Sequence, residues 1–555
     1  MARTISIGAQ DFAELIRRNN FYIDKTHFIK EWWENEDIVT LITRPRRFGK
    51  TLNISMLECF FSLEYNGHGE LFENLAIWKE ENYRELQGTY PVISLSFAGV
   101  KADNYADARE QIFQIIIDLY AKNEYLAKSD KLGKKDKEFF DRVGMDMSSN
   151  DAAKALQKLS GYLYRYYGKK TIILLDEYDT PMQEAYVNGY WEEIVSFTGT
   201  LFNNTFKTNP YLMRAVMTGI TRVSKESLFS DLNNLRIITT TSAEYSSCFG
   251  FTENEVFDAM DEFGWTNRNE IKKWYNGFTI GNMQDIYNPW SIINFLKEGK
   301  LKTYWANTSS NRLVGNLLQK GNKEIKMQFE ELLHGHSIKS EVDEEIIFNQ
   351  LDQDESAIWS LLLASGYLKV TCIKDDIYTL ELTNYEVKKM FFKIVKTWFK
   401  QDSSNYNDFI KALLLGDVEA MNIYMNKLAA AMFSSFDVGI KPSQSAAPER
   451  FYHGFVLGLL VDLALRYEIT SNRESGFGRY DVMLRPHNPA EDDGIILEFK
   501  VHNPKKESTL EDTVQEALKQ IEEKKYEQAL CNQGMDKSHI RKYGFAFKGK
   551  NILIG

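Results

Sequence analysis

A segment near the start of the chain, Ile38–Leu57, carries the residue types that bind a nucleotide phosphate. An apolar stretch leads into a basic loop that ends in Gly49-Lys50-Thr51, and a helical pattern follows. Backbone N–H groups at the start of such a helix face the anion, Lys50 reaches the terminal phosphates and Thr51 can bind Mg²⁺. The pattern GxxxxGK[ST] has a glycine where this chain has Arg44. The other loop residues that we assign to the nucleotide site are Arg46, Arg47 and Phe48.

Polar residues that follow two further apolar stretches can complete this site. The stretch TIILLD ends in Asp176, which is followed by Glu177, and this fits a Walker B element. Asp176 would hold Mg²⁺, directly or through water, and Glu177 would polarise the attacking water. The alternative is a buried strand that ends in an acidic turn. Another stretch, Tyr211–Met217, is followed by Thr218 and Arg222, which either sense the γ-phosphate or only cap and solvate the turn.

Near the C-terminus, three residues have the types and spacing of a divalent-metal site. Glu498 and Lys500 stand one residue apart in IILEFKV, so on a strand their side chains project to the same side. A carboxylate from a neighbouring strand, Asp481, can meet Glu498 and hold Mg²⁺ or Mn²⁺. Lys500 can orient an attacking water or stabilise charge that develops on a phosphate. The alternative is an exposed strand with an ordinary Glu/Lys pair.

Residues on the two adjacent helical segments can support this metal site. Glu449 would complete the acidic cluster, and Gln520 and Lys524 could reach the backbone of a substrate. These helices belong to a predicted αβββαβ order in residues 433–555. The expected segments are a helix over Glu449–Arg466, strands over Tyr467–Asn472, Arg479–Arg485 and Gly494–Val501, a helix over Thr509–Ala529, and strands over Tyr543–Phe547 and Asn551–Ile554.

The first region, residues 1–295, must position the phosphate-binding residues. Its apolar runs alternate with helical stretches such as Thr51–Leu63 and Ala106–Ala121. Buried strands that alternate with helices predict a parallel α/β sheet covered on both faces. The expected strands are Ile38–Ile42, Pro91–Phe97, Thr171–Leu175 and Leu212–Met217.

The second region, residues 296–432, has the order of a winged helix. A helical stretch, Ser356–Ser365, is followed by strand-like runs over Tyr367–Ile373 and Ile377–Leu382, and a long helix begins at Asn384. Further helices are expected up to residue 432. The stretch Phe433–Pro448 is rich in Ser, Pro and Ala and is the best candidate for a linker.

Several motifs of the first region resemble the predicted AAA-ATPase-like family of bacteria. The matching segments are RPRRFGKT, LLDEYDTP, TGITRVSKESLFSDLNN, WYNGF and YNPWSIINF. Members of that family carry the same RPRRFGK[ST] loop, so Arg44 is a family trait. The resemblance covers roughly residues 4–300 and implies an AAA+/STAND-like fold that binds ATP.

Residues from about 445 to 555 resemble the PD-(D/E)xK nuclease superfamily, in the branch that is usually fused behind this ATPase. The matching segments are FYHGFVLGLL, SNRESGFGRYDVML, IILEFK and ALKQIEEKKY. This resemblance implies a restriction-endonuclease-like domain that cuts nucleic acid with the help of a metal.

Composition sets limits on these expectations. The 555 residues include 67 Lys and Arg against 78 Asp and Glu, a net charge of −11, which excludes a uniformly basic nucleic-acid coat but not a local basic groove. The 4 cysteines are far apart, so neither a zinc ribbon nor a disulfide framework is expected. The N-terminus shows no signal peptide, and no apolar stretch is long enough to span a membrane. These features predict a cytoplasmic protein without a membrane partner.

The sequence therefore predicts an ATP-binding, metal-dependent nuclease that cuts DNA under the control of an N-terminal ATPase. The first alternative is a nucleotide-controlled, STAND-like module that binds DNA or signals without cleavage. The second alternative is an ATPase that binds nucleotide but turns it over negligibly. The choice between DNA and RNA stays open, as does the oligomeric state, for which a homo-oligomer is one option.

Overall fold

A computed structural model gives the architecture of the chain. It describes residues 2–221, 229, 232–306, 314–315, 317–318, 323–343, 355–398, 403–432, 456, 460, 463, 466–471, 474–475, 478–479, 481–489, 491–549 and 551–555. The chain divides into two compact units. Unit 1 comprises residues 1–317 and 337–388, and unit 2 comprises residues 318–336 and 389–555.

A five-stranded parallel sheet forms the centre of unit 1. Its order is β2-β3-β4-β1-β5, so β4 lies between the strand that enters the basic loop and the strand that ends in Asp176. The bounds are β1 (Val39–Thr43), β2 (Val92–Ser96), β3 (Thr171–Asp176), β4 (Leu212–Gly219) and β5 (Leu235–Ile238). The four predicted strands are confirmed to within two residues. The fifth strand, β5, was not predicted.

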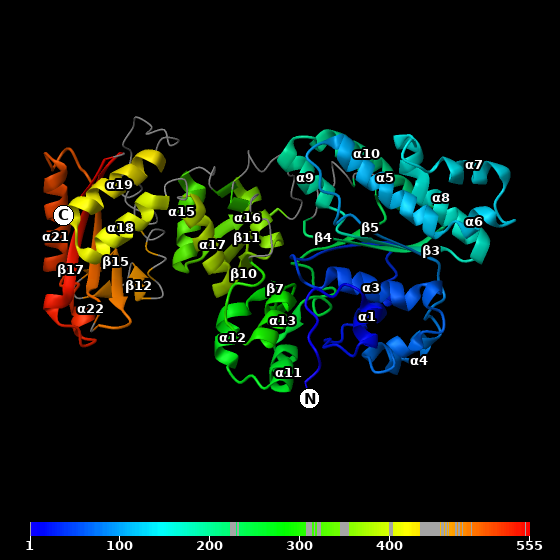
Figure 1. Cartoon of the computed structure of the whole chain (residues 1–555), viewed down its shortest axis with the longest axis horizontal. Helices are drawn as coiled ribbons and strands as arrows, with labels where there is room; N and C mark the ends of the chain where they lie inside the picture. Colours follow the sequence, from blue (N-terminus) through cyan, green and yellow to red (C-terminus); the bar gives the residue numbers. More distant parts are fainter. Residues whose placement is uncertain are drawn as a thin grey trace. The chain divides into compact units, whose positions relative to one another are not determined.

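Helices cover both faces of this sheet, as expected for a buried parallel sheet. In Figure 1, α1, α3 and α4 lie on one face, and α5, α8 and α10 lie on the other. The helices are α1 (Phe12–Arg17), α2 (His27–Asn35), α3 (Lys50–Phe61), α4 (Glu81–Arg84), α5 (Tyr105–Lys122), α6 (Tyr125–Lys128), α7 (Lys134–Arg142), α8 (Ser149–Tyr167), α9 (Thr180–Asn188) and α10 (Trp191–Phe202).

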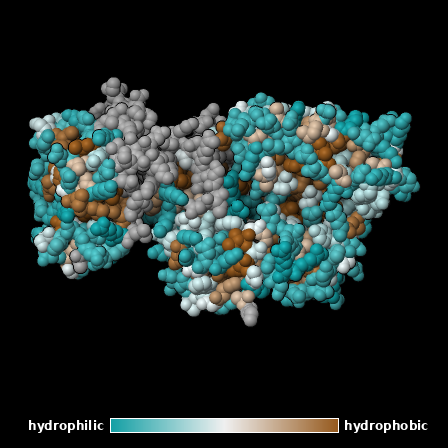
Figure 2. Space-filling view, in the orientation of Figure 1, coloured by the Kyte–Doolittle hydropathy of each residue, from teal (hydrophilic) through white to brown (hydrophobic). Residues whose placement is uncertain are grey.

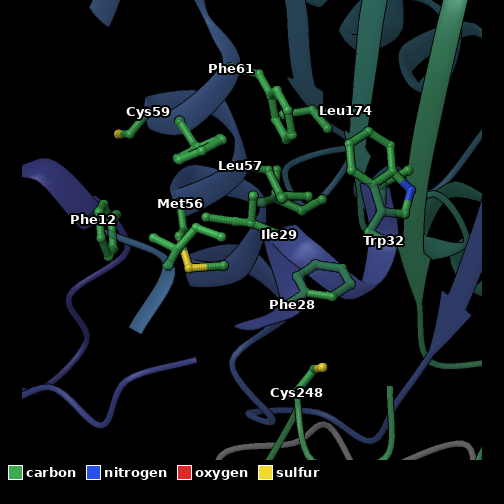
Figure 3. Packing of buried hydrophobic residues seen from close by; sticks show 14 of the residues in the cluster. Phe12, Phe28, Ile29, Trp32, Met56, Leu57, Cys59, Phe61, Leu174 and Cys248 are labelled. Atoms are coloured by element: carbon green, nitrogen blue, oxygen red, sulfur yellow. The ribbon is translucent and has the colours of Figure 1, made fainter. Parts of the chain in front are cut away.

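The helix that follows the basic loop, α3, is anchored in an aromatic core. Met56, Leu57 and Phe61 of α3 pack with Trp32 of α2, and Leu174 of β3 closes the cluster (Figure 3). Each of these five side chains is at most 1% exposed. Packing on two sides leaves α3 little freedom to move, so the position of its N-terminus is fixed by the core.

A smaller subdomain follows the sheet within unit 1. It has a three-stranded antiparallel sheet of order β6-β8-β7 and three helices. The elements are β6 (Phe251–Thr252), α11 (Glu253–Phe263), α12 (Arg268–Tyr275), β7 (Phe278–Ile280), β8 (Met283–Tyr287) and α13 (Pro289–Glu298). Asn288 caps α13, since its side-chain oxygen accepts from the N–H groups of Trp290 and Ser291.

The predicted helix and wing are confirmed in the next segment. A helix is followed by two antiparallel strands, and a third strand from earlier in the chain joins them in the order β10-β11-β9. The bounds are β9 (Ile338–Glu341), α16 (Glu355–Ala364), β10 (Leu368–Lys374), β11 (Ile377–Leu382) and α17 (Tyr385–Trp398).

A buried carboxylate, Glu386, fastens the start of α17. It accepts from the backbone N–H groups of Tyr304 (2.5 Å), Trp305 (2.7 Å) and Ala306 (3.3 Å), and from the Ser291 hydroxyl (2.7 Å). Burial raises the pKa of Glu386 to about 7, although these hydrogen bonds oppose the shift. The carboxyl group is therefore protonated in the folded protein at pH values where an exposed one is ionised.

This carboxyl group predicts a pH dependence of stability. Its pKa is higher in the folded than in the unfolded chain, so its contribution is complete below about pH 4.5 and is lost as the pH rises to about 7. The variant Glu386→Gln keeps the shape of the side chain but has no carboxyl group that titrates. We expect the free energy of unfolding of the wild type to fall by up to about 3 kcal/mol relative to the variant over this range. Urea unfolding of both proteins at several pH values measures this difference. Free energies of unfolding that change with pH in the same way in both proteins would contradict the prediction.

Unit 2 contains a mixed sheet of order β12-β15-β16-β17-β18, in which only β16 and β17 pair in parallel among the described strands. The strands are β12 (Tyr467–Ser471), β13 (Glu474–Ser475), β14 (Gly478–Arg479), β15 (Val482–Pro486), β16 (Gly494–Val501), β17 (Ile540–Lys548) and β18 (Asn551–Ile554). The helices are α15 (Lys323–His334), α18 (Ser403–Leu415), α19 (Val418–Met432), α21 (Leu510–Glu523) and α22 (Gln528–Cys531).

The described part of unit 2 confirms the predicted βββαβ order with three local differences. The strand expected over residues 543–547 begins earlier, at Ile540. The strand expected over residues 479–485 begins at Val482, because Gly478 and Arg479 pair with β13 instead. The long helix expected after Thr509 is interrupted after Glu523, and Lys525 adopts a left-handed conformation there (φ 51°). The predicted linker, and most of the helix predicted before β12, lie outside the described residues.

The edge of this sheet is covered by the preceding helices. Asn422 and Asn426 of α19 hold β18, because each side-chain amide both donates to and accepts from the backbone of one residue of that strand. Side chains thus satisfy backbone groups that an edge strand would leave open. The helices α18 and α19 therefore pack with the C-terminal sheet.

Hydrophilic residues predominate on the face of the protein seen in Figure 2, with hydrophobic residues in separate groups between them. Among the helices that the structure describes, none is both long enough and apolar enough to cross a membrane.

Candidate functional sites

The basic loop of unit 1 leads from β1 into α3 with the geometry of a phosphate site. Gly49, the N-cap of α3, has φ 85°, and no side chain caps the helix. The Lys50 ammonium group is buried and donates to the carbonyl oxygens of Arg44 and Pro45, both at 2.9 Å. Backbone N–H groups at the start of a helix can donate to an anion when no side chain caps them. An adjacent ammonium group strengthens such binding.

Arg44 turns away from this anion site and supports the fold. Its guanidinium group is fully buried and donates to the carbonyl oxygens of Thr43 (2.9 Å), Thr239 (2.7 Å) and Glu244 (3.2 Å). Burial lowers its pKa to about 10. Arg44 thus joins the end of β1 to the segment after β5. Because the side chain at this position has a structural role, the glycine of the usual pattern is not needed here.

Restoring the usual glycine should therefore harm the protein. Arg44→Gly leaves a cavity and several buried carbonyl groups without donors, so we expect the free energy of unfolding to drop by about 3–5 kcal/mol. The matched control is Arg47→Gly, since Arg47 is exposed and has φ 65°. This control should change stability by less than about 1 kcal/mol. Urea denaturation compares them, and equal effects would refute the role of Arg44.

Three oxygen-bearing side chains meet at the ends of neighbouring elements. The Thr51 hydroxyl donates to Asp176 Oδ2 at 2.6 Å, and the Thr218 hydroxyl donates to Asp176 Oδ1 at 2.5 Å. Burial raises the pKa of Asp176, while these two hydrogen bonds lower it. The sheet order explains the meeting, because β4 places Thr218 between the loop strand and β3.

Glu177 directly follows β3 in an unusual backbone conformation. Its φ is 50°, a region that costs energy for a residue with a side chain. The Thr180 hydroxyl contacts Glu177 Oε2 at 3.4 Å, and the Glu177 N–H group contacts the Thr218 hydroxyl at 3.5 Å. Such strain at the end of a site strand is typical of residues that the fold holds for a function.

Residues of the later subdomain pack against the basic loop and support it. The ring of Phe48 is buried against Phe278 (ring centroids 4.9 Å apart), and the Arg47 guanidinium lies 4.4 Å from the centroid of Trp290. Asn288, the cap of α13, also donates to the carbonyl oxygen of Arg46 at 3.2 Å. The motifs WYNGF and YNPWSIINF are therefore parts of the phosphate loop's support.

The residues of this first site fit a nucleotide and Mg²⁺. The ammonium group of Lys50 and the start of α3 offer donors to phosphate, and Thr51 with Asp176 offers the hard oxygen atoms that Mg²⁺ prefers. Arg222, which was predicted to join this site, lies outside the described residues.

The second site lies on the adjacent strands β15 and β16 of unit 2. Val482 pairs with Leu497, which brings Asp481 beside Glu498, and Asp481 Oδ2 accepts from the N–H group of Phe499 at 2.7 Å. Glu498 is only 2% exposed. The Phe499 ring points to the other side of the strand, where it packs against Phe545 (ring centroids 5.3 Å apart).

Gln520 of α21 joins the two functional residues of β16. Its Oε1 accepts from Lys500 Nζ at 2.7 Å, and its Nε2 donates to Glu498 Oε1 and contacts the Tyr526 hydroxyl at 3.2 Å. In this structure the amide of Gln520 is thus engaged by the site itself. The sequence suggested contact with a substrate backbone, which remains a prediction.

The carboxylate set fits a divalent metal only in part. Asp481 and Glu498 supply hard oxygen atoms, but the described residues contain no group of three or more His, Cys, Asp or Glu side chains placed to hold a metal ion. Glu449, the predicted third member, lies outside the described residues. Two carboxylates and the ammonium group of Lys500 nevertheless lie at the paired strands, where they offer ligands for a cation and a donor for an anion.

Sequence reasoning missed two residues at the first site, Asp179 and Gln183, which lie beside the phosphate loop. At the second site Tyr526, the last residue of the matching segment ALKQIEEKKY, contacts Gln520. An acidic side chain within the turn DEYD was a signal for Asp179, because a second acid so close to a buried strand needs a partner. Gln183 gave no such signal.

The regions that contain the two sites match known protein families. The sequence pattern described as "Predicted AAA-ATPase" matches residues 6–229, and that of the PD-(D/E)XK nuclease superfamily matches residues 447–555. Both resemblances seen in the sequence are thereby confirmed. Residues 6–229 are therefore similar to the predicted AAA-ATPase family, and residues 447–555 are similar to the PD-(D/E)XK nuclease superfamily.

Two individual proteins are similar over longer stretches. One is the "Uncharacterized protein in vnfD 5'region" of Azotobacter chroococcum mcd 1, 24% identical over 394 residues, or 70% of this chain and 68% of that protein. The other is the crystal structure of a STAND protein with a tetratricopeptide repeat sensor from Pyrococcus horikoshii, 11% identical over 80% of this chain. This chain spans 55% of that structure, and the TM-score of 0.24 is too low to support an argument.

Proposed function

We propose that this protein is an ATP-binding, metal-dependent nuclease that cleaves DNA phosphodiester bonds in the cytoplasm, with unit 1 controlling cleavage. The observation that carries the proposal is the linked set in unit 2, where Gln520 holds Glu498 and Lys500 on one side of β16 and Asp481 lies beside them. In an ordinary surface Glu/Lys pair the carboxylate would be exposed, and the two side chains would not share a half-buried amide.

The side chains of unit 2 have separate tasks in this proposal. Mg²⁺ or Mn²⁺, when bound by Asp481 and Glu498, would supply charge neutralisation and an acidified water. Gln520 fixes the direction of the Glu498 carboxylate, because its amide donates to Glu498 and accepts from Lys500. Lys500 is thereby held where it can stabilise negative charge on a phosphate oxygen.

The side chains of unit 1 support ATP binding in the same way. Lys50 and the start of α3 would bind the phosphates, and Thr51 and Asp176 would hold Mg²⁺. Glu177, at the end of β3, would orient the attacking water, and Thr218 would hold Asp176 in place.

The test is cleavage of supercoiled and linear DNA with Mg²⁺ or Mn²⁺, with and without ATP. Product that requires the metal supports the nuclease, and a difference between the lanes with and without ATP supports control by unit 1. Tight DNA binding without product on either substrate would instead support the STAND-like binding module.

A further inference from the structure

A chain of hydrogen bonds joins the phosphate loop to the tip of β4 through helix α9. Arg46 Nη2 donates to Gln183 Oε1 at 3.1 Å, and Gln183 Nε2 donates to Asp179 Oδ2 at 2.8 Å. The same carboxylate oxygen accepts from the N–H groups of Ile220 (2.9 Å) and Thr221 (3.0 Å). Residues from three separate stretches of the chain therefore form one continuous polar network.

The carboxylate of Asp179 is the fixed point of this network. The residue is fully buried, and the Thr221 hydroxyl adds a further hydrogen bond to Oδ2 at 3.1 Å. The backbone at Gly219 approaches this carboxylate closely, since a Cβ atom there would lie 2.8 Å from Asp179 Oδ1. A buried carboxylate with several donors on one oxygen is held firmly.

Gln183 connects the firmly held carboxylate of Asp179 to the guanidinium group of Arg46. A side-chain amide has a donor end and an acceptor end, and here the donor end faces a carboxylate while the acceptor end faces a guanidinium group. The opposite orientation would place like groups against each other. The direction of the amide, and with it the position of the Arg46 guanidinium, thus follows from Asp179.

The charge of Arg46 acts at the phosphate site. Pro45, the residue before Arg46, accepts from the Lys50 ammonium group at 2.9 Å, and the Arg46 guanidinium group is held by Gln183 of α9 at 3.1 Å. Both cations therefore belong to the segment formed by the loop and the N-terminus of α3, where an anion would bind. A second cation gains more from a triphosphate than from a diphosphate, because the triphosphate carries the greater negative charge.

We propose that Gln183 and Asp179 are positioning residues that hold Arg46 as a second cation of the nucleotide site, and that this network favours ATP over ADP. The inference rests on the proposed binding of ATP by unit 1. It adds how the site distinguishes the two nucleotides, and it assigns a task to Arg46 that differs from the structural task of Arg44.

The test compares four proteins with the wild type. Gln183→Met has a similar length but offers neither a donor nor an acceptor, Arg46→Met removes the cation, and the double variant combines them. The control is Glu184→Met, the next residue of α9, for which no hydrogen bond to this network is present in the described structure. The affinities for fluorescent ATP and ADP analogues are measured in EDTA, and turnover is measured with Mg²⁺.

We expect Arg46→Met to lower the ratio of ATP to ADP affinity about tenfold, since a charge-assisted contact is lost. Gln183→Met should lower it in the same direction, and the double variant should match Arg46→Met, because Gln183 acts only through Arg46. Glu184→Met should leave the ratio unchanged. If Gln183→Met does not fold, Asp179→Asn takes its place with the same expected direction.

Two results would overturn the inference. One is a double variant whose effect is the product of the single effects, which would show that the residues act independently. The other is a ratio that stays the same in Arg46→Met. In both cases the wild type still binds nucleotide and the proposed function stands. A wild type that binds neither analogue would instead refute the proposed ATP site itself.

Discussion

Glu498→Ala is expected to lower metal-dependent cleavage of DNA by about 10³-fold or more. The change removes a metal-binding oxygen and the acceptor that orients Gln520, and single groups that stabilise a transition state contribute effects of this size. Cleavage of a labelled linear duplex in Mg²⁺ or Mn²⁺ measures the rate. Lys500→Ala should give a comparable loss.

Two matched variants separate chemistry from folding in this experiment. Glu498→Gln keeps the shape of the side chain and a hydrogen bond to Gln520, yet it lacks the negative charge, so it should be as inactive as Glu498→Ala. Glu516→Ala removes an exposed carboxylate of α21 that pairs only loosely with Lys519 (3.8 Å), and it should retain full activity. Equal cleavage by Glu498→Gln and the wild type would remove the site assignment.

Lys50→Met is expected to weaken ATP binding by about 100-fold or more. The ammonium group is a buried cation beside the start of α3, and methionine fills the same space without charge. Titration with a fluorescent ATP analogue measures the affinity, and Lys101→Met, at an exposed lysine of the same unit, is the control. Unchanged affinity in Lys50→Met would place the nucleotide elsewhere.

A second variant of unit 1 separates binding from turnover. Glu177→Gln keeps the backbone contact to Thr218 but cannot polarise water as a carboxylate does. ATP binding should persist while hydrolysis falls. If wild type and Glu177→Gln hydrolyse ATP at the same negligible rate, the protein uses ATP only as a signal.

The local elements could be predicted because their patterns are local. Uninterrupted apolar runs gave β1 to β4, and the alternation around Glu498 placed that residue and Lys500 on one side of β16, with Phe499 on the other. Helix ends were less certain where a single residue decides them, as Lys525 does after α21. Propensity does not reveal one left-handed residue in a charged segment.

The parts that could not be predicted depend on contacts between distant residues. The short strand β5 has only four residues and no distinctive pattern, so its place beside β1 follows from packing alone. Arg44 stands where the usual pattern has glycine, and its structural task could not be predicted because two of its carbonyl partners lie about 200 residues later. The shared amide of Gln520 is equally invisible, since backbone register sets it.

The support of the phosphate loop has a practical consequence for where the chain can be cut. The matched ATPase pattern ends at residue 229, but Arg44 is satisfied by residues 239–245, Phe48 packs on Phe278, and Asn288 holds the carbonyl of Arg46. A fragment of residues 6–229 would keep the side chains proposed to contact phosphate. It would lack the later residues that support the loop. The segment that matches the family pattern and the segment that folds around the loop thus have different borders, and the shorter segment should not form this site on its own.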